Sequence, residues 1–354
     1  MRFGNYSCYY SKYMENQTID IVKNRKPLWA TIIGIVLTIF AVFAYLVFFQ
    51  TAQKGSELEQ FTIPNTTVDD SYEIAGLLKE KGFIKSVTAF RIAFSGLSGI
   101  TSRCVDCIEP GAYKISKSMS AYGIANIIKK GPYMKWVVIP EGLRKEEIAD
   151  ILSQTLGWTA EEKDKWIHTY TALDFDHTEG VYFPDTYLIP VNEAPLDVAK
   201  RLRAKFEEKF APYAKEAVKQ NIKWTTVIKL ASIVQREAAN KNDMPLVAGI
   251  LWNRLFKNMR LEVDSTLQYI RGDTGKGWWA PITVADKQTD SPYNTYKNTG
   301  LPPHPISNPG IEAIQSSLYP ATTTCLYYLH DSAGVIHCSD TYDGHLENIK
   351  NYLK

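Results

Sequence analysis

The sequence lacks the features that mark several common classes of protein. Its net charge is only +2 over 354 residues, and it contains no arginine-rich run and no zinc-finger spacing. Phosphate backbones call for a basic surface, so nucleic acid is not an expected partner. The histidines form no H-x-x-x-H pair, and no serine lies in a G-x-S-x-G elbow. We therefore expect no metal, no other cofactor and no serine hydrolase.

Cysteine is also scarce, with five residues, of which only Cys8 lies N-terminal to residue 100. Cys325 and Cys338 bracket two apolar runs around a DSAG turn, and a hairpin there would bring them within disulfide distance. Cys104 and Cys107 form a C-x-x-C without a second pair, which disfavours a zinc site. A local disulfide and two free thiols both remain open for that pair.

One long apolar run is present at residues 28–49, LWATIIGIVLTIFAVFAYLVFF, and it contains no charged residue. As a helix it would span about 33 Å at roughly 1.5 Å per residue, which matches a hydrocarbon core. Lys23, Arg25 and Lys26 crowd its N-terminal side. The run is too long for a signal-peptide core, and no Ala-x-Ala site follows it. We expect a single-pass cell-membrane protein with a cytoplasmic tail (1–27) and an extracytoplasmic body.

After the apolar run, two segments repeat one plan, in which an apolar strand ends at Ile-Pro and a helix follows. The first is FTIPNTTVDDSYEIAGLLKEKGFI and the second is VVIPEGLRKEEIADILSQTLGW. Between them, GAYKISKSMSAYGIANIIKKG predicts a short strand and a capped helix that ends at Gly131. The sequence thus predicts an α+β fold with a polar linker (50–60), a small α+β module (61–135) and a larger domain (136–354).

Helical patterns dominate the larger domain. Helices are predicted over residues 198–220, 225–239 and 245–258, and strands over 137–139 and in a C-terminal hairpin. The stretch SPYNTYKNTGLPPHPISNPG at 291–310 is too rich in proline, glycine and asparagine for either. It predicts a long ordered loop, and such loops in compact domains tend to be functional.

The carboxylates carry the clearest chemical signal. Glu179 and Asp185 bracket an aromatic, apolar tract in HTEGVYFPDTYLIP. A glutamic acid against such a tract is disfavoured as an anion, so Glu179 is a candidate general acid. The alternative is that Glu179 caps a helix and Asp185 closes a turn. Glu237 lies at the edge of the apolar stripe of LASIVQREAAN, where it either orients catalytic groups or pairs with a distant arginine.

The residues E-G-x-x-F-P-D-T-Y at 179–187 resemble the signature of the endolytic murein transglycosylase (YceG-like) family. The resemblance continues through LASIVQREA, PLVAGILWNRLFKNMRLEVDSTLQY, SPYNTY, GLPP, NPG and the stretch from Thr341 to His345. The module at 61–135 resembles the LysM-like part of that family. Gln235 stands where the family usually has glutamate, and His304 stands where a small residue is more frequent.

The resemblance implies endolytic cleavage of the β-1,4 bond between N-acetylmuramic acid and N-acetylglucosamine in nascent peptidoglycan strands, which leaves 1,6-anhydro ends and limits strand elongation. It implies glycan strands, the cell membrane and peptidoglycan synthases as partners, and Glu179 as the catalytic acid. The residues expected to support catalysis or bind substrate are Asp185, Tyr187, Glu237, Asp264, Tyr293, Asn294 and His345.

Two alternatives stay open from the sequence. One is a hydrolytic muramidase with Glu179 as acid and Glu237 or Asp264 as the second carboxylate. The other is a non-catalytic, membrane-anchored scaffold that binds peptidoglycan through the LysM-like module and recruits synthesis proteins.

Overall fold

The computed structural model describes residues 29–45, 48–65, 71–96, 108–172 and 178–353. The chain divides into two compact units, one ending at Tyr133 and the other running from Met134 to Lys354. Each unit has its own hydrophobic core. The fold is mixed α+β, as the sequence predicts. The predicted boundary lies two residues later, at 135/136.

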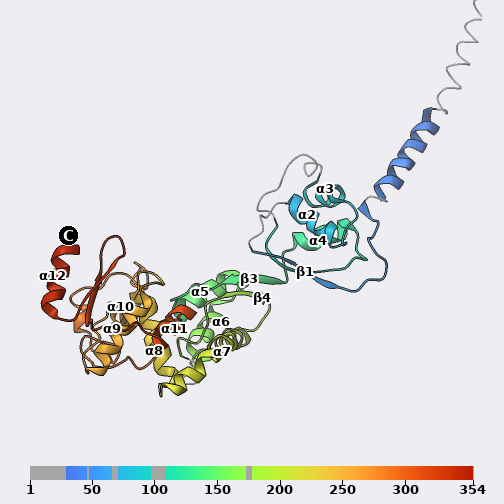
Figure 1. The fold of residues 1–354 in the computed structure, drawn as a ribbon. Coiled ribbons are helices and arrows are strands. Elements are labelled where there is room, and N and C mark those ends of the chain that lie inside the picture. The colour runs from blue at the N-terminus through green and yellow to red at the C-terminus, as the bar shows by residue number, and fades with distance from the viewer. Residues whose placement is uncertain (1–28, 46–47, 66–70, 97–107, 173–177, 354) are drawn as a thin grey trace, which may run out of the picture. The chain divides into compact units, whose positions relative to one another are not determined.

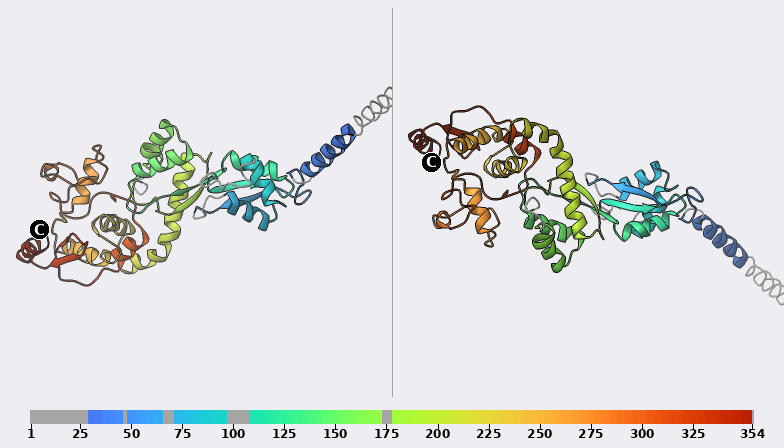
Figure 2. Two further views of the ribbon diagram at one scale, coloured as in Figure 1. Left: turned by 90° about the horizontal axis from the view of Figure 1, so that it is seen from above. Right: turned by 90° about the horizontal axis from the view of Figure 1, so that it is seen from below.

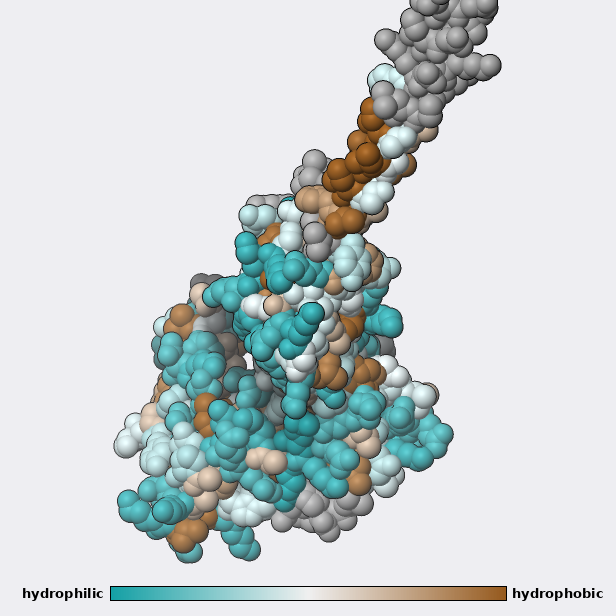
Figure 3. All heavy atoms as spheres, turned by 90° about the vertical axis from the view of Figure 1, so that its right-hand side faces the viewer, coloured by the Kyte–Doolittle hydropathy of each residue, from teal (hydrophilic) through white to brown (hydrophobic). Residues whose placement is uncertain are grey.

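A helix over residues 29–45 comes first, and most of its large apolar side chains are exposed. Phe40 is 67% exposed and Phe43 is 63% exposed, and Figure 3 shows this apolar surface in brown. Within the described ranges, no helix is long and apolar enough to cross a membrane. Residues 28, 46 and 47 of the expected span lie outside the described residues, as do the tail 1–27 with Cys8 and the pair Cys104 and Cys107.

The first unit contains an antiparallel pair of strands, β1 (Glu59–Ile63) and β2 (Gly111–Ile115), with Phe61 opposite Tyr113. Among the described residues, α2 (Ser71–Glu80), α3 (Val87–Ser95) and α4 (Ala121–Lys129) accompany it (Figure 1). The hydroxyls of Ser86 and Ser120 accept bonds from the first-turn amides of α3 and α4, at 3.2 and 3.1 Å. The core combines the inner faces of strands and helices: Phe61, Ile63, Ile74, Leu78, Tyr113, Ile124 and Ile128.

The second unit begins with another antiparallel pair, β3 (Met134–Val138) and β4 (Thr186–Pro190), in which Trp136 lies opposite Leu188. Helix α5 (Lys145–Leu156) packs against β3 and is followed by α6 (Ala160–Lys165) and the π-helix η2 (Trp166–Tyr170). Strand β4 was not predicted from the sequence, although Tyr187 and Ile189 alternate inward with a period of two.

A run of helices follows in this unit, and α7 (Pro195–Lys219) is the longest of the described ones (Figure 2). It is followed by α8 (Trp224–Glu237), α9 (Met244–Phe256), α10 (Asp264–Arg271), the 3₁₀ helix η4 (Asp286–Gln288) and α11 (Ile311–Leu318). Helix α8 contacts α7, α9, α10 and α11, so it is the central element of the unit. The three long helices predicted from periodicity begin and end within three residues of α7, α8 and α9. The stretch 291–310 is an ordered loop, as predicted, with one isolated bridge from Thr299 to Arg260.

The C-terminal region contains the hairpin of β5 (Tyr327–His330) and β6 (Ile336–Ser339), followed by α12 (Tyr342–Tyr352). The predicted hairpin is confirmed, with Leu329 opposite His337. A disulfide joins Cys325 to Cys338, with the Cα atoms 5.9 Å apart. The hairpin is thereby closed covalently beside its open end.

Candidate active site

Glu179 lies between the π-helix η2 and strand β4, and the backbone at Gly180 directs it inward. Gly180 has φ of +85°, and a Cβ there would lie 2.7 Å from Pro305 and 2.8 Å from Ile228. Only glycine fits so close an approach of the chain to the 291–310 loop and to α8. The predicted apolar tract is real, since Val181, Tyr182 and Phe183 are all buried. Glu179 itself is 2% exposed.

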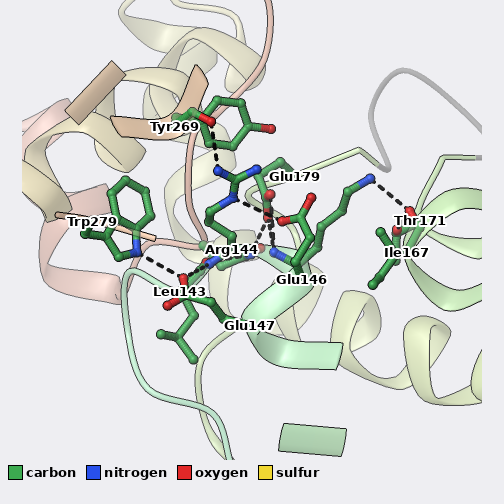
Figure 4. Close-up of polar contacts among 11 residues, drawn as sticks. Leu143, Arg144, Glu146, Glu147, Ile167, Thr171, Glu179, Tyr269 and Trp279 are labelled. Atoms are coloured by element: carbon green, nitrogen blue, oxygen red, sulfur yellow. Dashed lines mark hydrogen bonds and ion pairs between the residues drawn. The ribbon is translucent and has the colours of Figure 1, made fainter. Parts of the chain in front are cut away.

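The carboxyl group of Glu179 accepts hydrogen bonds from two protein groups. The backbone N–H of Lys145, in the first turn of α5, donates to both oxygens at 3.1 and 3.3 Å. The side-chain amide of Asn308 donates to Oε1 at 2.6 Å. Figure 4 shows the carboxyl group against the start of α5. Amide donors at a helix N-terminus favour negative charge, so this cradle suits the carboxylate that forms when Glu179 loses its proton.

Asn308 is the most connected side chain at the site. Its amide nitrogen also donates to the carbonyl of Leu143 at 3.0 Å, and its amide oxygen accepts from the N–H of Tyr182 at 2.9 Å. Its backbone exchanges bonds with the carbonyl of Leu143 and the N–H of Gly142, each at 2.8 Å. The residue therefore fixes the start of α5, the Glu179 segment and the long loop in one arrangement.

The ammonium group of Lys145 is directed away from Glu179. Its Nζ donates to the carbonyl of Ile167 at 3.0 Å in the π-helix, and the whole residue is 9% exposed. Lys145 thus contacts Glu179 through its backbone N–H, while its ammonium charge lowers the pKa of Glu179 from a distance.

The pKa of Glu179 is raised from 4.5 to about 8. Burial is the largest cause, and the negative charge of Glu146 adds to it. The charges of Lys145 and Arg144 and the N–H of Lys145 act in the opposite direction but do not outweigh burial. Near neutral pH Glu179 is therefore mostly a carboxylic acid, which is the form that a general acid needs.

Arg144 forms the next part of the site. Its guanidinium lies 4.2 Å from the ring centre of Tyr269 and 4.5 Å from that of Trp278. It donates to the carbonyl of Tyr269 at 2.8 Å and to Glu146 at 3.1 Å (Figure 4). The pairing with Glu146 offsets the charge of that carboxylate, so the two residues partly cancel in their effect on Glu179.

A second aromatic contact ties the segment after α10 to the start of α5. The indole N–H of Trp279 donates to Glu147 at 3.0 Å, and the guanidinium of Arg236 lies 3.8 Å from the Trp279 ring centre. Arg236 also donates to the carbonyl of Gly142 at 3.4 Å. Trp279, Arg236 and Glu147 thus connect the segment after α10, the end of α8 and the start of α5, and this stack was not foreseen from the sequence.

The predicted supporting residues fall into four places. Tyr293 lies near Glu179, with its ring 5.1 Å from that of Tyr269 and 6.5 Å from that of His304. Burial, followed by the charge of Glu179, raises the pKa of Tyr293 to about 12. Asp185 lies just before β4 and accepts a bond from the N–H of the next residue, Thr186, at 2.8 Å.

Tyr187 and Asn294 lie in the interior. Tyr187 is 6% exposed and its hydroxyl donates to the carbonyl of Phe183 at 2.6 Å. Asn294 is 0% exposed and its amide donates to the carbonyls of Lys287 and Thr289 at 3.1 and 2.7 Å. In this structure neither side chain is available to a sugar ring, and both stabilise the surrounding chain.

Glu237, Asp264 and His345 meet in a separate cavity of about 550 Å³. Neither Lys145 nor Asn308, which hydrogen-bond Glu179, lines it, so among the described residues Glu179 is joined to the 291–310 loop but not to Glu237. Over the part of the chain that the structure describes, no group of three His, Cys, Asp or Glu side chains is placed to hold a metal ion.

The mixed α+β fold with a buried glutamic acid can be compared with known proteins, and the comparison shows the family of this chain. The family model described as "YceG-like family" matches residues 61–351, and the chain belongs to that family. The signature from Glu179 to Tyr187 lies within the match.

Relatives with a printed activity are similar over most of the chain. An endolytic murein transglycosylase of Bacillus subtilis (strain 168) is 28% identical over 79% of this chain and 81% of its own length. One of Streptococcus pneumoniae serotype 2 (strain D39 / NCTC 7466) is 25% identical over 79% of this chain, and the chain spans only 56% of that relative. A crystal structure of a yceG-like protein from Listeria monocytogenes has a TM-score of 0.56 and 26% identity, over 83% of this chain and 99% of that one.

Proposed function

We propose that the chain is an endolytic peptidoglycan lytic transglycosylase in which Glu179 is the catalytic acid and base. The observation that carries the proposal is the buried carboxyl group, whose pKa of about 8 keeps it protonated at neutral pH. The names of the relatives, endolytic murein transglycosylases, support the same reaction and the same substrate. Glycan strands of peptidoglycan are the proposed substrate.

The reaction breaks the bond between C1 of N-acetylmuramic acid and O4 of N-acetylglucosamine. Glu179 gives its proton to O4, so the N-acetylglucosamine end leaves as an alcohol. The carboxylate then takes the proton of the muramic C6 hydroxyl, whose oxygen bonds to C1 and closes the 1,6-anhydro ring. Water is not consumed, and Glu179 is left protonated for the next cycle.

The surroundings of Glu179 suit a group that holds and releases a proton in turn. The N–H of Lys145 and the amide of Asn308 already donate to its oxygens, so no rearrangement is needed when the carboxylate forms. Because Glu179 is 2% exposed, the glycosidic oxygen reaches it only after neighbouring side chains move. Tyr293, half-buried beside Tyr269 and His304, is the predicted residue placed to contact a sugar there.

A hydrolytic muramidase is the second candidate, and it requires a second carboxylate that activates water. The candidates from the sequence, Glu237 and Asp264, line the other cavity. The carboxylate with the strongest influence on Glu179 is Glu146, and it is paired with Arg144 at 3.1 Å. This arrangement favours the mechanism that needs one carboxyl group.

The location of the enzyme is part of the proposal. The charge-free run at 28–49 and the exposed apolar helix at 29–45 support a single-pass anchor with a cytoplasmic N-terminus. The unit from 61 to 135 is proposed as a LysM-like module, and peptidoglycan synthases as partners. An anchored enzyme would cut nascent strands near the bilayer and limit their length. Releasing the body from the anchor should then broaden the strand-length distribution in cells, whereas an unchanged distribution would mean that the helix only localises the enzyme.

The test of the reaction is digestion of purified glycan strands by the full-length protein and by Glu179→Gln. We expect wild-type protein to give anhydro ends and the variant to lose at least a hundredfold in rate. The control is Glu207→Gln, an exposed residue paired with Arg203 at 3.2 Å, which should cut normally. Equal cleavage by Glu179→Gln would reject the assignment, and no cleavage by any form would favour the scaffold.

A further inference from the structure

The cavity that contains Glu237, Asp264 and His345 has no part in the reaction described above. It measures about 550 Å³, a size typical of small-ligand sites. The end of α8, α9, the start of α10, β5 and α12 contribute to it. Its lining is polar and aromatic: Glu237, Arg254, Glu262, Asp264, Lys287, Tyr296, Tyr327, Tyr328, His330, Tyr342 and His345, with Leu261, Val263 and Leu329.

Two carboxylates in this cavity are fixed in place by hydrogen bonds. Glu237 accepts from the N–H of Ser265 at 3.2 Å and from the hydroxyl of Tyr328 at 2.9 Å. Asp264 accepts from the hydroxyl of Tyr296 at 2.5 Å. These donors are neutral, so they orient the carboxylates without neutralising their charge.

Arg254, the arginine of the lining, forms its ion pair with Glu262 rather than with Glu237 or Asp264. Arg254 donates to the carbonyls of Leu326, Arg260 and Leu261 at 2.6, 3.0 and 2.7 Å, and to Glu262 at 3.2 Å. It therefore offsets the charge of Glu262 and holds backbone together. Lys287 is the other cation of the lining, and its ammonium lies 4.4 Å over the ring of Tyr296. The lining thus carries three carboxylates, Glu237, Glu262 and Asp264, and two cations, Arg254 and Lys287.

Aromatic rings complete the lining. The ring of Tyr327 lies 5.8 Å from that of Tyr342 and is stacked with His345 at 5.5 Å. In the described part of the chain, Nδ1 of His345 is buried and has no hydrogen-bond partner. Ring faces attract cations: the guanidinium of Arg254 lies 5.0 Å from the ring centre of Tyr327, and aromatic rings recur in sites that bind ammonium ligands.

We propose that this cavity binds a primary ammonium group on the peptide stem of the wall polymer while the attached glycan is cut at Glu179. The proposal rests on the proposed function for the identity of the polymer. A lining with one more carboxylate than cations, set among aromatic rings, favours a cation, since neutral hydroxyls of a sugar need no excess negative charge in the protein. A free amine marks a stem that is not cross-linked, so the cavity would select uncrosslinked strands.

The first experiment measures binding without cleavage. Full-length Glu179→Gln protein in detergent is titrated with a lysine-containing wall peptide and with the same peptide acetylated on its side-chain amine. We expect acetylation to weaken binding about tenfold, the loss that corresponds to one charge-assisted hydrogen bond. Adding Asp264→Asn, or in a second form Glu237→Gln, should remove most of that difference, because both replacements keep an acceptor oxygen and lose the charge.

The same titration includes a control variant and can contradict the proposal. Asp197→Asn changes an exposed carboxylate paired with Lys200 at 3.1 Å and should leave the difference intact. Equal binding of the two peptides, or a preference that survives Asp264→Asn, would overturn the proposal. Cleavage assays then separate the two claims: wild-type protein that cuts free and acetylated strands with the same KM refutes the ammonium site alone, whereas failure to cut either refutes the proposed function.

Discussion

Replacing Glu179 by glutamine should change how the stability of the protein depends on pH. The pKa of Glu179 is about 8 in the folded protein and 4.5 for an unperturbed group, mainly because of burial. The folded state therefore binds this proton more tightly than the unfolded chain does. Its contribution to stability is fully present below about pH 4.5 and is lost as the pH rises to and beyond 8. Each pH unit within that window is worth about 1.4 kcal/mol at most.

The assay is urea unfolding of wild-type protein and Glu179→Gln at pH values from 5 to 9. Glutamine keeps an acceptor oxygen for the N–H of Lys145 but carries no proton equilibrium. We expect the wild-type free energy of unfolding to fall by several kcal/mol relative to the variant across that range. The exposed Glu207→Gln variant should follow wild type. A wild-type-to-variant difference that does not change with pH would refute the raised pKa, and with it the role of Glu179 as an acid at neutral pH.

Three further changes test the packing around the site. Asn308→Ala removes a hydrogen-bond partner from Glu179, from the carbonyl of Leu143 and from the N–H of Tyr182. Denaturant unfolding should therefore show that the free energy of unfolding falls by about 3 kcal/mol. A fall below about 1 kcal/mol would mean that this amide does not organise the site. Replacing Cys325 and Cys338 by serine opens a disulfide whose cysteines are 13 residues apart, which should cost about 3 kcal/mol, and equal melting of the oxidised and reduced wild-type protein would contradict it. Gly249→Ala puts a Cβ 2.3 Å from the carbonyl oxygen of Ala321 and should destabilise the protein by about 1–3 kcal/mol. The matched variant Gly76→Ala, in a helix with no atom within 4 Å of the added Cβ, should stabilise it by about 0.5–1 kcal/mol. Equal effects of the two variants would show that the contact at Gly249 is not tight.

Local sequence patterns predicted the long helices well. The apolar periodicity of α7, α8 and α9 is sustained over three or more turns, and it places their ends within three residues. Strand β4 is only five residues long and follows directly on the Glu179 signature. Its alternation is too short to distinguish a strand from a turn. Its pairing partner, β3, is about 50 residues earlier in the chain.

The chemistry of the site was predictable where it depends on neighbours in sequence. Val181, Tyr182 and Phe183 adjoin Glu179, so its burial follows from the local tract. The bond from Asn308 spans 129 residues, and no local pattern reports it. The 291–310 loop was predicted to be functional, but its composition does not reveal which residue reaches Glu179.

The residues expected to support catalysis or bind substrate lie in different places in the tertiary structure. Tyr293 lies near Glu179, and burial followed by the charge of Glu179 raises the pKa of its hydroxyl. Asn294, its neighbour in sequence, is 0% exposed and binds backbone carbonyls. Glu237 and Asp264 share the second cavity instead. Adjacent residues in one motif thus have different roles, and these roles depend on the tertiary structure.

Cleavage of purified glycan strands in water enriched in oxygen-18 tests the central claim most directly. If the Glu179 carboxylate takes the proton of the C6 hydroxyl and the C6 oxygen bonds to C1, wild-type protein should give 1,6-anhydro ends without any oxygen-18. Products with reducing muramic ends that carry one oxygen-18 and the mass of one added water would contradict the transglycosylase reaction and establish a hydrolase.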